Sequence, residues 1–597
     1  MAQASLGRLR EAGGFATIHR NMAGLSTFDA FKTARPADAR ELSGAELSAL
    51  HGVLLSILDD MVSVCRETGI RWFPGGGTLL GTLREKGFIP WDDDLDFNME
   101  RRDWPRFRDA FLARFPGKYE IQEPRLRRIP SSSSAGEEGL PRCGLARHGL
   151  AFPRIRLEGT SAPVREDLYS PWNSRGVFID VFLLESTWDL APLRLAHGGG
   201  SMVLGFLYSC RKHFAERRLL RGWGMSSPAF LAKRFLGAAL APLSVETWAG
   251  LWNAWNSACH NPVSRYATFP VGRRHFFGEL ALREGFAAGV EGEFAGRKVP
   301  VPKGAEAYME RLYGLGWRVP PPPERRERHP ALEPFFVRPE DAPRSVRIAV
   351  ASHKPSSMPR DAAYIPVFAG AAGKPSIPGF ARDDEGDGGI SARNASYCEL
   401  TALWWLWKNV DAEVLGLVHY RRHFAGPLGT VAGTRDFLRL LEASGADAIL
   451  PRPRNYFIET ARSQYAHAHH AKDLDEARRA IAETQPGFLD AFDRTMALRK
   501  GHRFNMFAMR KPLFSEYCEW LFGLLTTLER RIDTTGYSAY DRRVLGFLAE
   551  RLLDVWIAGR GVRYAEMPVL HLEGQHWPLK IARFLWRKAA GALRRRR

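Results

Sequence analysis

The sequence predicts a mixed α/β protein with more than one domain, and three observations lead to this prediction. The chain has 597 residues, which is too long for one hydrophobic core, so about two to four domains are expected. Residues 41–330 alternate short apolar runs typical of strands with segments of helical spacing. A stretch rich in proline and charge, RVPPPPERRERHPALEP at 318–334, cannot form the interior of a regular element and is expected to close the first domain.

The domain organisation follows from these features. We expect a polar lead-in, a first domain, a linker, a second domain and a basic tail, at residues 1–40, 41–330, 331–345, 346–576 and 577–597. The second domain is expected to open with a short buried strand at 347–352, which is typical of the first strand of an α/β unit. Inside the first domain, the serine-rich run 131–139 is expected to be a loop.

The charge balance indicates the kind of partner. The chain carries 85 Lys and Arg against 66 Asp and Glu, a net charge of +19. This favours an anionic partner such as a nucleotide, a phosphorylated glycan, a nucleic acid or a membrane surface. The alternative is a basic proteome that uses arginine freely. We expect no nucleic-acid partner, because the charge is concentrated in the tail and no nucleic-acid motif occurs.

The basic tail at 577–597, WPLKIARFLWRKAAGALRRRR, combines apolar residues at helical spacing with basic residues and no acid. A basic amphipathic helix with a tryptophan fits an anionic membrane surface, and the alternative is a packing helix with a frayed end. The six cysteines are dispersed, and neither an apolar leader nor a long uncharged apolar run occurs. We therefore expect a cytoplasmic protein without a transmembrane helix, peripheral at the inner face of the cytoplasmic membrane.

The stretch GGGTLLGTLREKGFIPWDDDLDF at 75–97 carries the densest chemistry of the chain. The glycine triplet allows a tight turn and a close approach to a ligand. Thr78 is expected to cap a short helix over 78–87, which ends at Gly87. A glycine turn at a helix N-terminus is a ready anion site.

The acids that follow this helix are expected to lie on a strand. A period of two places Asp92, Asp94 and Asp96 on one face and Leu95 and Phe97 on the other. Two neighbouring carboxylates repel each other unless a cation lies between them. Mg²⁺ prefers carboxylate oxygens together with substrate phosphates, so this face is a candidate metal site.

A third acid strengthens the metal hypothesis. Asp180 is the only charge in the apolar run Val177 to Leu184, and a buried carboxylate is costly unless it is paired or binds metal. Three acids on two neighbouring strands would hold one or two metal ions for phosphoryl chemistry. The alternative is a solvated acidic loop with Asp180 paired to an arginine.

These residues carry a resemblance to a known family. GGTLLGTLREKGFIPWDDDLDF, GVFIDVFLLE and the closing segment at 293–329 resemble the LicD family, phosphotransferases whose relatives include fukutin and fukutin-related protein. The resemblance covers about residues 45–330 and implies a nucleotidyltransferase-type fold with an insertion at 121–150. It implies transfer of phosphocholine or a phospho-alditol from a CDP-linked donor to a hydroxyl of a cell-surface glycan, releasing CMP. The alternative is a nucleotidyltransferase that attaches a nucleotide to a small acceptor and releases pyrophosphate.

The resemblance also implies roles for single residues. The expected Mg²⁺ or Mn²⁺ ligands are Asp94, Asp96 and Asp180, with Asp92 assisting, and Asp180 is alternatively the base for the acceptor hydroxyl. The expected donor-binding residues are Gly76, Gly77 and Thr78. Arg154 and Arg156, alternate residues of one expected strand, are added as phosphate-neutralising side chains, with surface charge as the alternative.

The donor head group stays open at this point. A choline site needs aromatic faces for a quaternary ammonium, and Trp72, Trp91, Phe97 and Trp172 are available. The alternative is that these aromatic residues belong to the core.

In the second domain, VLGLVHYRRHF at 414–424 is expected to be a buried strand with a basic exit. Ligands of open α/β sheets bind beyond the carboxyl ends of strands, so this exit is a candidate site for a nucleotide diphosphate, with a basic surface loop as the alternative. Much of 346–575 resembles a domain common in bacterial capsule and O-antigen clusters, which is mostly without an assigned function and is regarded as glycosyltransferase-like.

This second resemblance implies a glycosyltransferase-like α/β fold. It implies a nucleotide-sugar donor and a lipid-linked or polymeric glycan acceptor. The candidate site residues are Asp384, Asp387, Asn394, Glu399, His419, Arg421 and Arg422. No Asp-x-Asp motif follows a strand in this domain, which argues against the common metal-dependent kind of glycosyltransferase.

Overall fold

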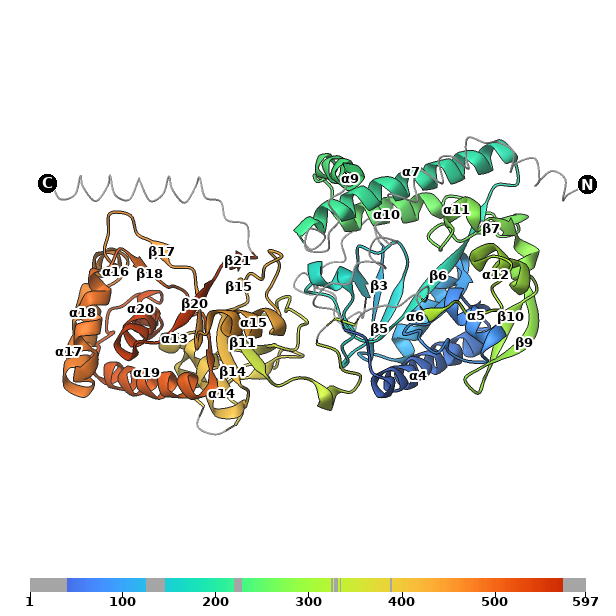
Figure 1. The fold of residues 1–597 in the computed structure, drawn as a ribbon. Helices are drawn as coiled ribbons and strands as arrows, with labels where there is room; N and C mark the ends of the chain where they lie inside the picture. Colours follow the sequence, from blue (N-terminus) through green and yellow to red (C-terminus); the bar gives the residue numbers. More distant parts are fainter. Residues whose placement is uncertain are drawn as a thin grey trace, which may run out of the picture. The chain divides into compact units, whose positions relative to one another are not determined.

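A computed structural model describes residues 40–124, 145–218, 228–323, 326, 331–332, 334–386 and 389–572. The chain divides into two compact units, Met1–Ala342 and Pro343–Arg597, each of which is described by itself (Figure 1). The division falls inside the expected linker. Both units combine helices with sheets, so the predicted mixed α/β class is confirmed. The lead-in up to residue 39, the tail at 577–597 and Asp387 lie outside the described residues.

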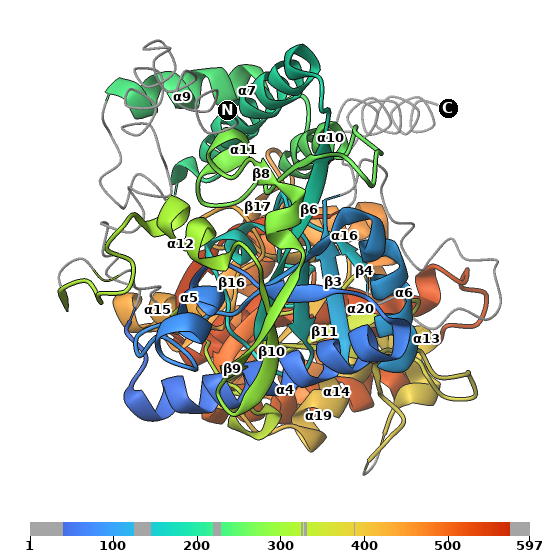
Figure 2. The same ribbon diagram turned by 90° about the vertical axis from the view of Figure 1, so that its right-hand side faces the viewer.

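The first unit is built on a sheet that has eight strands within the described residues. In sheet order, the strands are β1 (Trp72–Pro74), β2 (Asp96–Glu100), β6 (Phe178–Thr187), β5 (Arg154–Leu157), β3 (Tyr119–Glu123) and β4 (Leu145–Arg147), with β7 (Tyr266–Thr268) and β8 (Ala281–Leu282) continuing from β6. A separate hairpin, β9 (Ala288–Phe294) and β10 (Arg297–Pro302), packs beside α5 (Gly76–Arg84) (Figure 2).

The helices of this unit pack around the sheet. They are α4 (Gly44–Thr68), α5, α6 (Trp104–Arg114), α7 (Ala191–Ala215), α9 (Pro228–Ala239), α10 (Val245–Asn256), α11 (His275–Gly278) and α12 (Ala305–Tyr313). Helices α7, α9 and α10 gather at one end of the unit, away from α4 (Figures 1 and 2).

Helix α4 shows how the sequence forms these elements. Ser43 and Glu46 form a capping box at its N-terminus, and Gly69 ends it in the left-handed conformation. Among the described residues, α4 is the one helix long and apolar enough to cross a membrane by length and composition. Its apolar face, including Ile57 and Met61, is buried in the same core cluster as the strands, as in a core helix of a folded domain.

The start of the expected linker packs onto the first unit. Ala331 pairs with Arg40, and Phe336 pairs with Ser161, as isolated β-bridges. Phe335 packs against the core cluster that contains α4. This segment is therefore an ordered part of the first unit.

The second unit has a sheet of nine strands within the described residues. In sheet order, they are β13 (Ala381–Arg382), β12 (Tyr364–Phe368), β11 (Val346–Ser352), β14 (Val414–His419), β19 (Phe507–Arg510), β16 (Ala448–Pro451) and β20 (Tyr564–Met567), with β15 (Arg422–Phe424) and β21 (Val569–His571) continuing from β14. Strands β12, β11 and β14 are parallel, so their carboxyl ends share one edge. The expected strands at 347–352 and from Val414 are confirmed.

Helices cover this second sheet and fill its core. They are α13 (Asn394–Tyr397), α14 (Leu400–Asn409), α15 (Thr434–Ser444), α16 (Ala461–Ala468), α17 (Ala471–Thr484), α18 (Leu489–Ala497), α19 (Lys511–Arg531) and α20 (Val544–Arg560). A small ladder joins β17 (Arg454–Asn455) to β18 (Lys500–Gly501). The largest core cluster of the unit combines residues of α14, α17, α19 and α20 with β11 and β14.

Candidate active site

The glycine triplet of the first unit lies directly against acidic and amide side chains. Gly75 caps α5, and its carbonyl accepts a hydrogen bond of 2.8 Å from the Leu79 N–H. Each glycine faces one polar side chain so closely that a Cβ would collide with it. In chain order, the pairs are Gly75 with Asn98, Gly76 with Asp96 and Gly77 with Asp92. Glycine is therefore needed here for the close approach between the start of α5 and the acids.

Strand β2 begins at Asp96 and is shorter than the sequence predicts. Its antiparallel partner β1 ends at Pro74, opposite Phe97, and one more backbone bond joins the Gly75 N–H to the Asp96 carbonyl at 3.0 Å. With no further partner residue in β1, the chain before Asp96 leaves the ladder. The predicted alternation holds within the strand, because Phe97 and Met99 are buried in the core while Asp96 faces the glycine turn.

Three acids lie just before this strand. One carboxylate oxygen from each of Asp92, Asp93 and Asp94 lies within 4.8 Å of the others. All three side chains are half-buried. The structure thus brings Asp92 and Asp94 together as predicted, but in a segment before the strand that also includes Asp93.

Asp96 and Asp180 are neighbours across two parallel strands. The register of β2 and β6 pairs Asp96 with Asp180, so the predicted placement of acids on adjacent strands is found. Asp180 also lies opposite Arg154 of β5. The Arg154 guanidinium donates two hydrogen bonds to the Asp180 carboxylate, Nε to Oδ1 at 2.6 Å and Nη2 to Oδ2 at 2.9 Å. The pairing of Asp180 with an arginine is therefore present in the structure.

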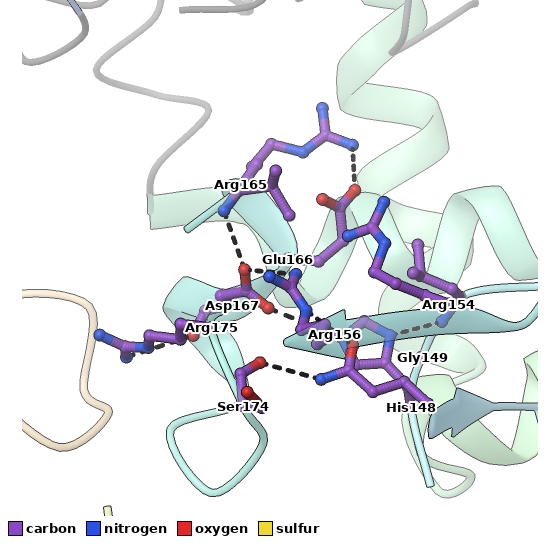
Figure 3. A network of polar contacts seen from close by, with 12 residues as sticks. His148, Gly149, Arg154, Arg156, Arg165, Glu166, Asp167, Ser174 and Arg175 are labelled. Carbon is purple, nitrogen blue, oxygen red and sulfur yellow. Dashed lines mark hydrogen bonds and ion pairs between the residues drawn. The ribbon is translucent and has the colours of Figure 1, made fainter. Parts of the chain in front are cut away.

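Arg156 differs from the expectation that it contacts a donor. Its guanidinium is fully buried, and it donates to Asp167 at 2.8 Å and to the Gly176 carbonyl at 2.7 Å (Figure 3). Burial lowers the pKa of Arg156 to about 10 although Asp167 opposes that shift. Because no part of the guanidinium is accessible, we assign Arg156 to the support of the loop that carries Asp167.

A buried charge network extends from this loop to the helices. Glu166 accepts a hydrogen bond of 2.6 Å from Lys212 of α7, and Arg165 lies 3.3 Å from Glu216. Burial raises the pKa of Glu166, but the charges of Lys212 and Arg165 outweigh it and hold the pKa well below its ordinary value. Ion pairs thus tie α7 to the segment that supports the site strands.

Thr78 has a different role from the predicted one. Helix α5 begins at Gly76, so Thr78 lies inside the helix and does not cap it. Its hydroxyl accepts a hydrogen bond of 2.8 Å from the Asp96 N–H. Thr78 is buried and fixes the first residue of β2 against α5.

Residues that sequence reasoning missed also surround the acids. The ring of His51 in α4 stacks on Phe88 at 3.8 Å, and its Nε2 donates to the Asp92 carbonyl at 2.7 Å. Burial lowers the pKa of His51, which favours the neutral ring. The hydroxyl of Tyr313 in α12 lies 4.0 Å from the position of a Cβ on Gly76. A single histidine in a helix and a tyrosine over 200 positions from the glycine turn gave no local signal.

The aromatic residues considered for a choline site have separate places. Trp72 stacks on Phe97 at 4.6 Å inside the core. Trp91 packs beside the cluster that contains α12, and the Arg326 guanidinium lies 4.1 Å from its ring centroid. Trp91 thus directly precedes Asp92 and lies outside the buried Trp72–Phe97 pair.

In the second unit, the structure brings His419 and Glu399 together at the end of β14. His419 Nε2 lies 3.8 Å from Glu399 Oε1, and it donates to the Phe504 carbonyl. Asn505 donates to the same Glu399 oxygen at 2.8 Å. Phe504 and Asn505 both have positive φ values, +78° and +51°, and such strained backbone is concentrated at functional sites.

The other predicted residues of this unit are more dispersed. Arg422 lies with its guanidinium 4.2 Å from the Phe504 ring centroid. Asp384 is paired with Arg382 at 2.7 Å, which lowers its pKa. Asn394 donates to the Cys398 carbonyl at 2.6 Å and holds the turn between α13 and α14. Asp384 and Asn394 therefore have local structural contacts.

Part of the first unit is similar to proteins of a known family. Residues 69–125 match the LicD/FKTN/FKRP nucleotidyltransferase domain, and this range contains the glycine triplet and the acids before β2. A 70-residue segment is 43% identical to the lipopolysaccharide cholinephosphotransferase LicD of Haemophilus influenzae. Residues 69–125 of the first unit thus match a LicD-family domain. The matched segment is 12% of this chain and 26% of that relative.

The second unit matches a less characterised group. Residues 347–561 match a domain of unknown function, DUF4422. A solved structure described as the apo form of the WbbM bifunctional glycosyltransferase is 29% identical, over 38% of this chain and 46% of that chain, with a TM-score of 0.36. The alignment thus spans under half of that protein, and at this TM-score we draw no structural argument from it. The expected order, a LicD-family domain followed by a domain of a largely uncharacterised family, is confirmed.

The acids of the LicD-family domain fit a hard divalent cation. Carboxylate oxygens are the ligands that Mg²⁺ prefers, and Asp92 and Asp94 bring theirs close together. Asp96 faces the same glycine turn as Asp92, and Asp180 lies beside Asp96. The residues that would hold the ion are therefore Asp92, Asp94 and their neighbour Asp93, together with Asp96 at the same glycine turn. Asp180, held by Arg154, lies at the border of the site.

Proposed function

We propose that the first unit transfers a phospho-substituent, phosphocholine or a phospho-alditol, from a CDP-linked donor to a hydroxyl of a cell-surface glycan. The observation that carries this proposal is the close packing of the glycine turn against Asp92 and Asp96, with Asp180 in register beside Asp96. The match to the LicD-family domain, and to a relative described as a cholinephosphotransferase, supports the choice of reaction.

The site residues would have different roles in this transfer. A bound Mg²⁺ or Mn²⁺ would neutralise the donor phosphates and make the phosphorus more electrophilic. The N–H groups of Gly76 and Gly77 at the start of α5 would hold a phosphate oxygen of the donor. Asp180 would accept the proton of the glycan hydroxyl. The glycan oxygen then bonds to the phosphorus that bears the substituent, and the bond from that phosphorus to the CMP oxygen breaks.

Arg154 adjusts the charge of this site. It is buried and donates two hydrogen bonds to the Asp180 carboxylate. Burial lowers the pKa of Arg154, but Asp180 outweighs this and raises the pKa overall. As a general base, Asp180 would take up the proton on a carboxylate oxygen.

For the second unit we propose transfer of a sugar from a nucleotide-sugar donor to a lipid-linked or polymeric glycan. This proposal is supported by the meeting of His419, Glu399 and Asn505 at the carboxyl edge of parallel strands. The basic tail at 577–597 would hold the protein at an anionic membrane surface on the cytoplasmic side.

The test of the first proposal is CMP release. Purified protein is incubated with Mg²⁺, a glycan extract and CDP-choline, CDP-ribitol or CDP-glycerol in turn. We expect CMP from one donor, and loss of that CMP in Asp94→Asn but not in Asp109→Asn, which alters an exposed acid of α6. Pyrophosphate released from CTP or ATP, without CMP from any CDP donor, would instead favour the nucleotidyltransferase alternative.

A further inference from the structure

A group of basic side chains follows three neighbouring strands of the second unit. Lys354 comes two residues after β11, Lys374 follows β12, and Arg421 comes two residues after β14. Because β12, β11 and β14 are parallel, these segments leave the sheet at the same edge. Lys354, Lys374 and Arg421 are all exposed.

Two of these cations share one aromatic ring. Lys354 Nζ lies 5.3 Å from the centroid of Tyr420, and the Arg421 guanidinium carbon lies 4.9 Å from it. The ring of His353 meets Tyr420 edge-on at 5.4 Å. Tyr420 therefore gathers three nitrogen-bearing side chains at the ends of β11 and β14.

The pKa of His353 reports the charges around it. Burial lowers this pKa, and Arg421, Lys354, Lys374 and Arg543 each lower it further. All four named charges are positive, so the surroundings of His353 disfavour a further cation and favour an anion.

Arg543 adds a second kind of positive potential. It is the N-terminal cap of α20, a helix of 17 residues, so the positive end of the helix dipole lies at the same place. Its Nε donates to Cys398 Sγ at 3.1 Å, which fixes the guanidinium beside the turn that carries Glu399. Basic side chains therefore surround the carboxyl ends of β11 and β14, and the Glu399 carboxylate lies next to them.

The acids of this unit do not form a metal site comparable to that of the first unit. Within its described residues, no three His, Cys, Asp or Glu side chains bring ligand atoms together, whereas Asp92, Asp93 and Asp94 of the first unit do so. Asp383 is buried and accepts hydrogen bonds from the Gly370 and Ala371 N–H groups at 2.6 and 2.9 Å. The groups at this edge that can neutralise a bound diphosphate directly are the basic side chains.

We propose that His353, Lys354, Lys374, Arg421 and Arg543 form a binding site for the diphosphate of a nucleotide-linked donor, and that this site needs no divalent cation. The inference deepens the proposed sugar transfer of the second unit and rests on it. The adjacent Glu399 and His419 place the acceptor side of the reaction next to the diphosphate. This inference adds four residues to the site: His353, Lys354, Lys374 and Arg543.

The test measures binding of UDP, GDP and inorganic pyrophosphate to the full-length protein by calorimetry, with EDTA present. We expect a nucleoside diphosphate to bind in EDTA, more weakly at high salt. Lys374→Ala and Arg543→Gln should each weaken binding about tenfold, because each removes a charge-assisted contact with phosphate. The matched control is Lys511→Ala, an exposed lysine next to Glu413 at the opposite end of β14.

Folding is checked so that each result is decisive. Thermal unfolding is recorded for every variant, and Lys354→Ala, an exposed change, serves if Arg543→Gln fails to fold. Binding that appears only with Mg²⁺, or that the variants leave unchanged, would overturn the site. Equal binding of pyrophosphate and the nucleotides would assign the diphosphate to a lipid-linked acceptor and overturn the donor assignment.

Failure of the site and failure of the proposed sugar transfer are distinguishable. If the variants lose nucleotide binding while no nucleotide sugar is consumed by the wild type, the site stands and the sugar transfer is wrong. If a Lys374→Ala/Arg543→Gln protein still transfers sugar at the wild-type rate, the transfer stands and the site is wrong.

Discussion

In the first unit, carboxylates of Asp92, Asp93 and Asp94 lie within 4.8 Å of one another beside a glycine turn. In the second unit, Lys354 and Arg421 gather around Tyr420 at the end of parallel strands. Both arrangements suit a phosphorylated donor, but their charges are opposite. An acidic site can attract phosphate only through a bound cation, whereas a basic site attracts it directly.

The two sites also differ in how they are supported. The acids of the first unit rest on buried ion pairs, including Arg154 with Asp180 and Arg156 with Asp167. Lys354, Lys374 and Arg421 of the second unit are exposed and lie on loops beyond the strands. We therefore expect substitutions in the buried ion pairs that support the first site to affect stability, and substitutions at the second site to affect mainly binding.

The largest effect is expected for Asp96→Asn. Loss of this charge removes a proposed metal ligand, so CMP release should fall about 1000-fold. The backbone N–H of Asp96 still donates to Thr78, so the midpoint of thermal unfolding should stay within a few degrees of the wild-type value. Sugar transfer by the second unit, measured on the same sample, should be unchanged. A collapse of the fold in this variant would show that Asp96 has a structural role instead.

The next effect concerns the buried support of the first site. Asp167→Ala leaves the fully buried Arg156 guanidinium without its carboxylate, so the free energy of unfolding should fall by about 3–5 kcal/mol. The comparison is Asp493→Ala, which breaks the exposed pair with Arg478 and should cost at most about 1 kcal/mol. Urea unfolding measures both. Equal losses in the two variants would contradict the role assigned to the buried pair.

The stability of the first unit is also expected to depend on pH. Burial raises the pKa of Glu279 to about 7, although the Tyr308 hydroxyl donates to it at 2.8 Å. Because the ordinary value is 4.5, the folded chain holds a proton that the unfolded chain has lost between these two pH values. Stability of the first unit should therefore fall as the pH rises from about 5 to 7 and then level off.

The control for this pH dependence is Glu279→Gln, which has no titrating group at the position. Urea unfolding at several pH values should show a flatter profile for this variant than for the wild type. An identical slope in both proteins would rule out Glu279 as the source.

The smallest effect is expected at His51. Its Nε2 holds the Asp92 carbonyl, so His51→Ala should raise the Mg²⁺ concentration needed for half-maximal CMP release about tenfold. His51→Gln keeps an N–H donor and should show a smaller rise. The maximal rate at saturating Mg²⁺ should be nearly unchanged in both. A loss of maximal rate with no change in the Mg²⁺ requirement would contradict this positioning role.

Several features of the fold and site could be predicted from the sequence because their signals are local. The buried strands β6, β11 and β14 are short apolar runs, and the alternation of Asp96 and Phe97 places one side chain on each face. The meeting of acids on two strands also followed, because Asp180 stands alone in an apolar run.

Other features depend on partners that lie far away in the chain. The start of β2 is set by the length of β1, and the pairing of Asp180 with Arg154 is set by the register of β5. Arg154 and Arg156 have the same sequence pattern, yet one borders the acids and the other is enclosed with Asp167. Local periodicity does not report which neighbour will cover a side chain.

The most direct test of the account is removal of divalent cations from a single sample in which both reactions are followed. CMP release from a CDP-linked donor and release of nucleoside diphosphate from a nucleotide sugar are measured before and after EDTA, and again after Mg²⁺ is restored. The account predicts that EDTA abolishes CMP release reversibly and leaves the second reaction nearly unchanged. Loss of both reactions in EDTA, or persistence of CMP release without a divalent cation, would contradict it.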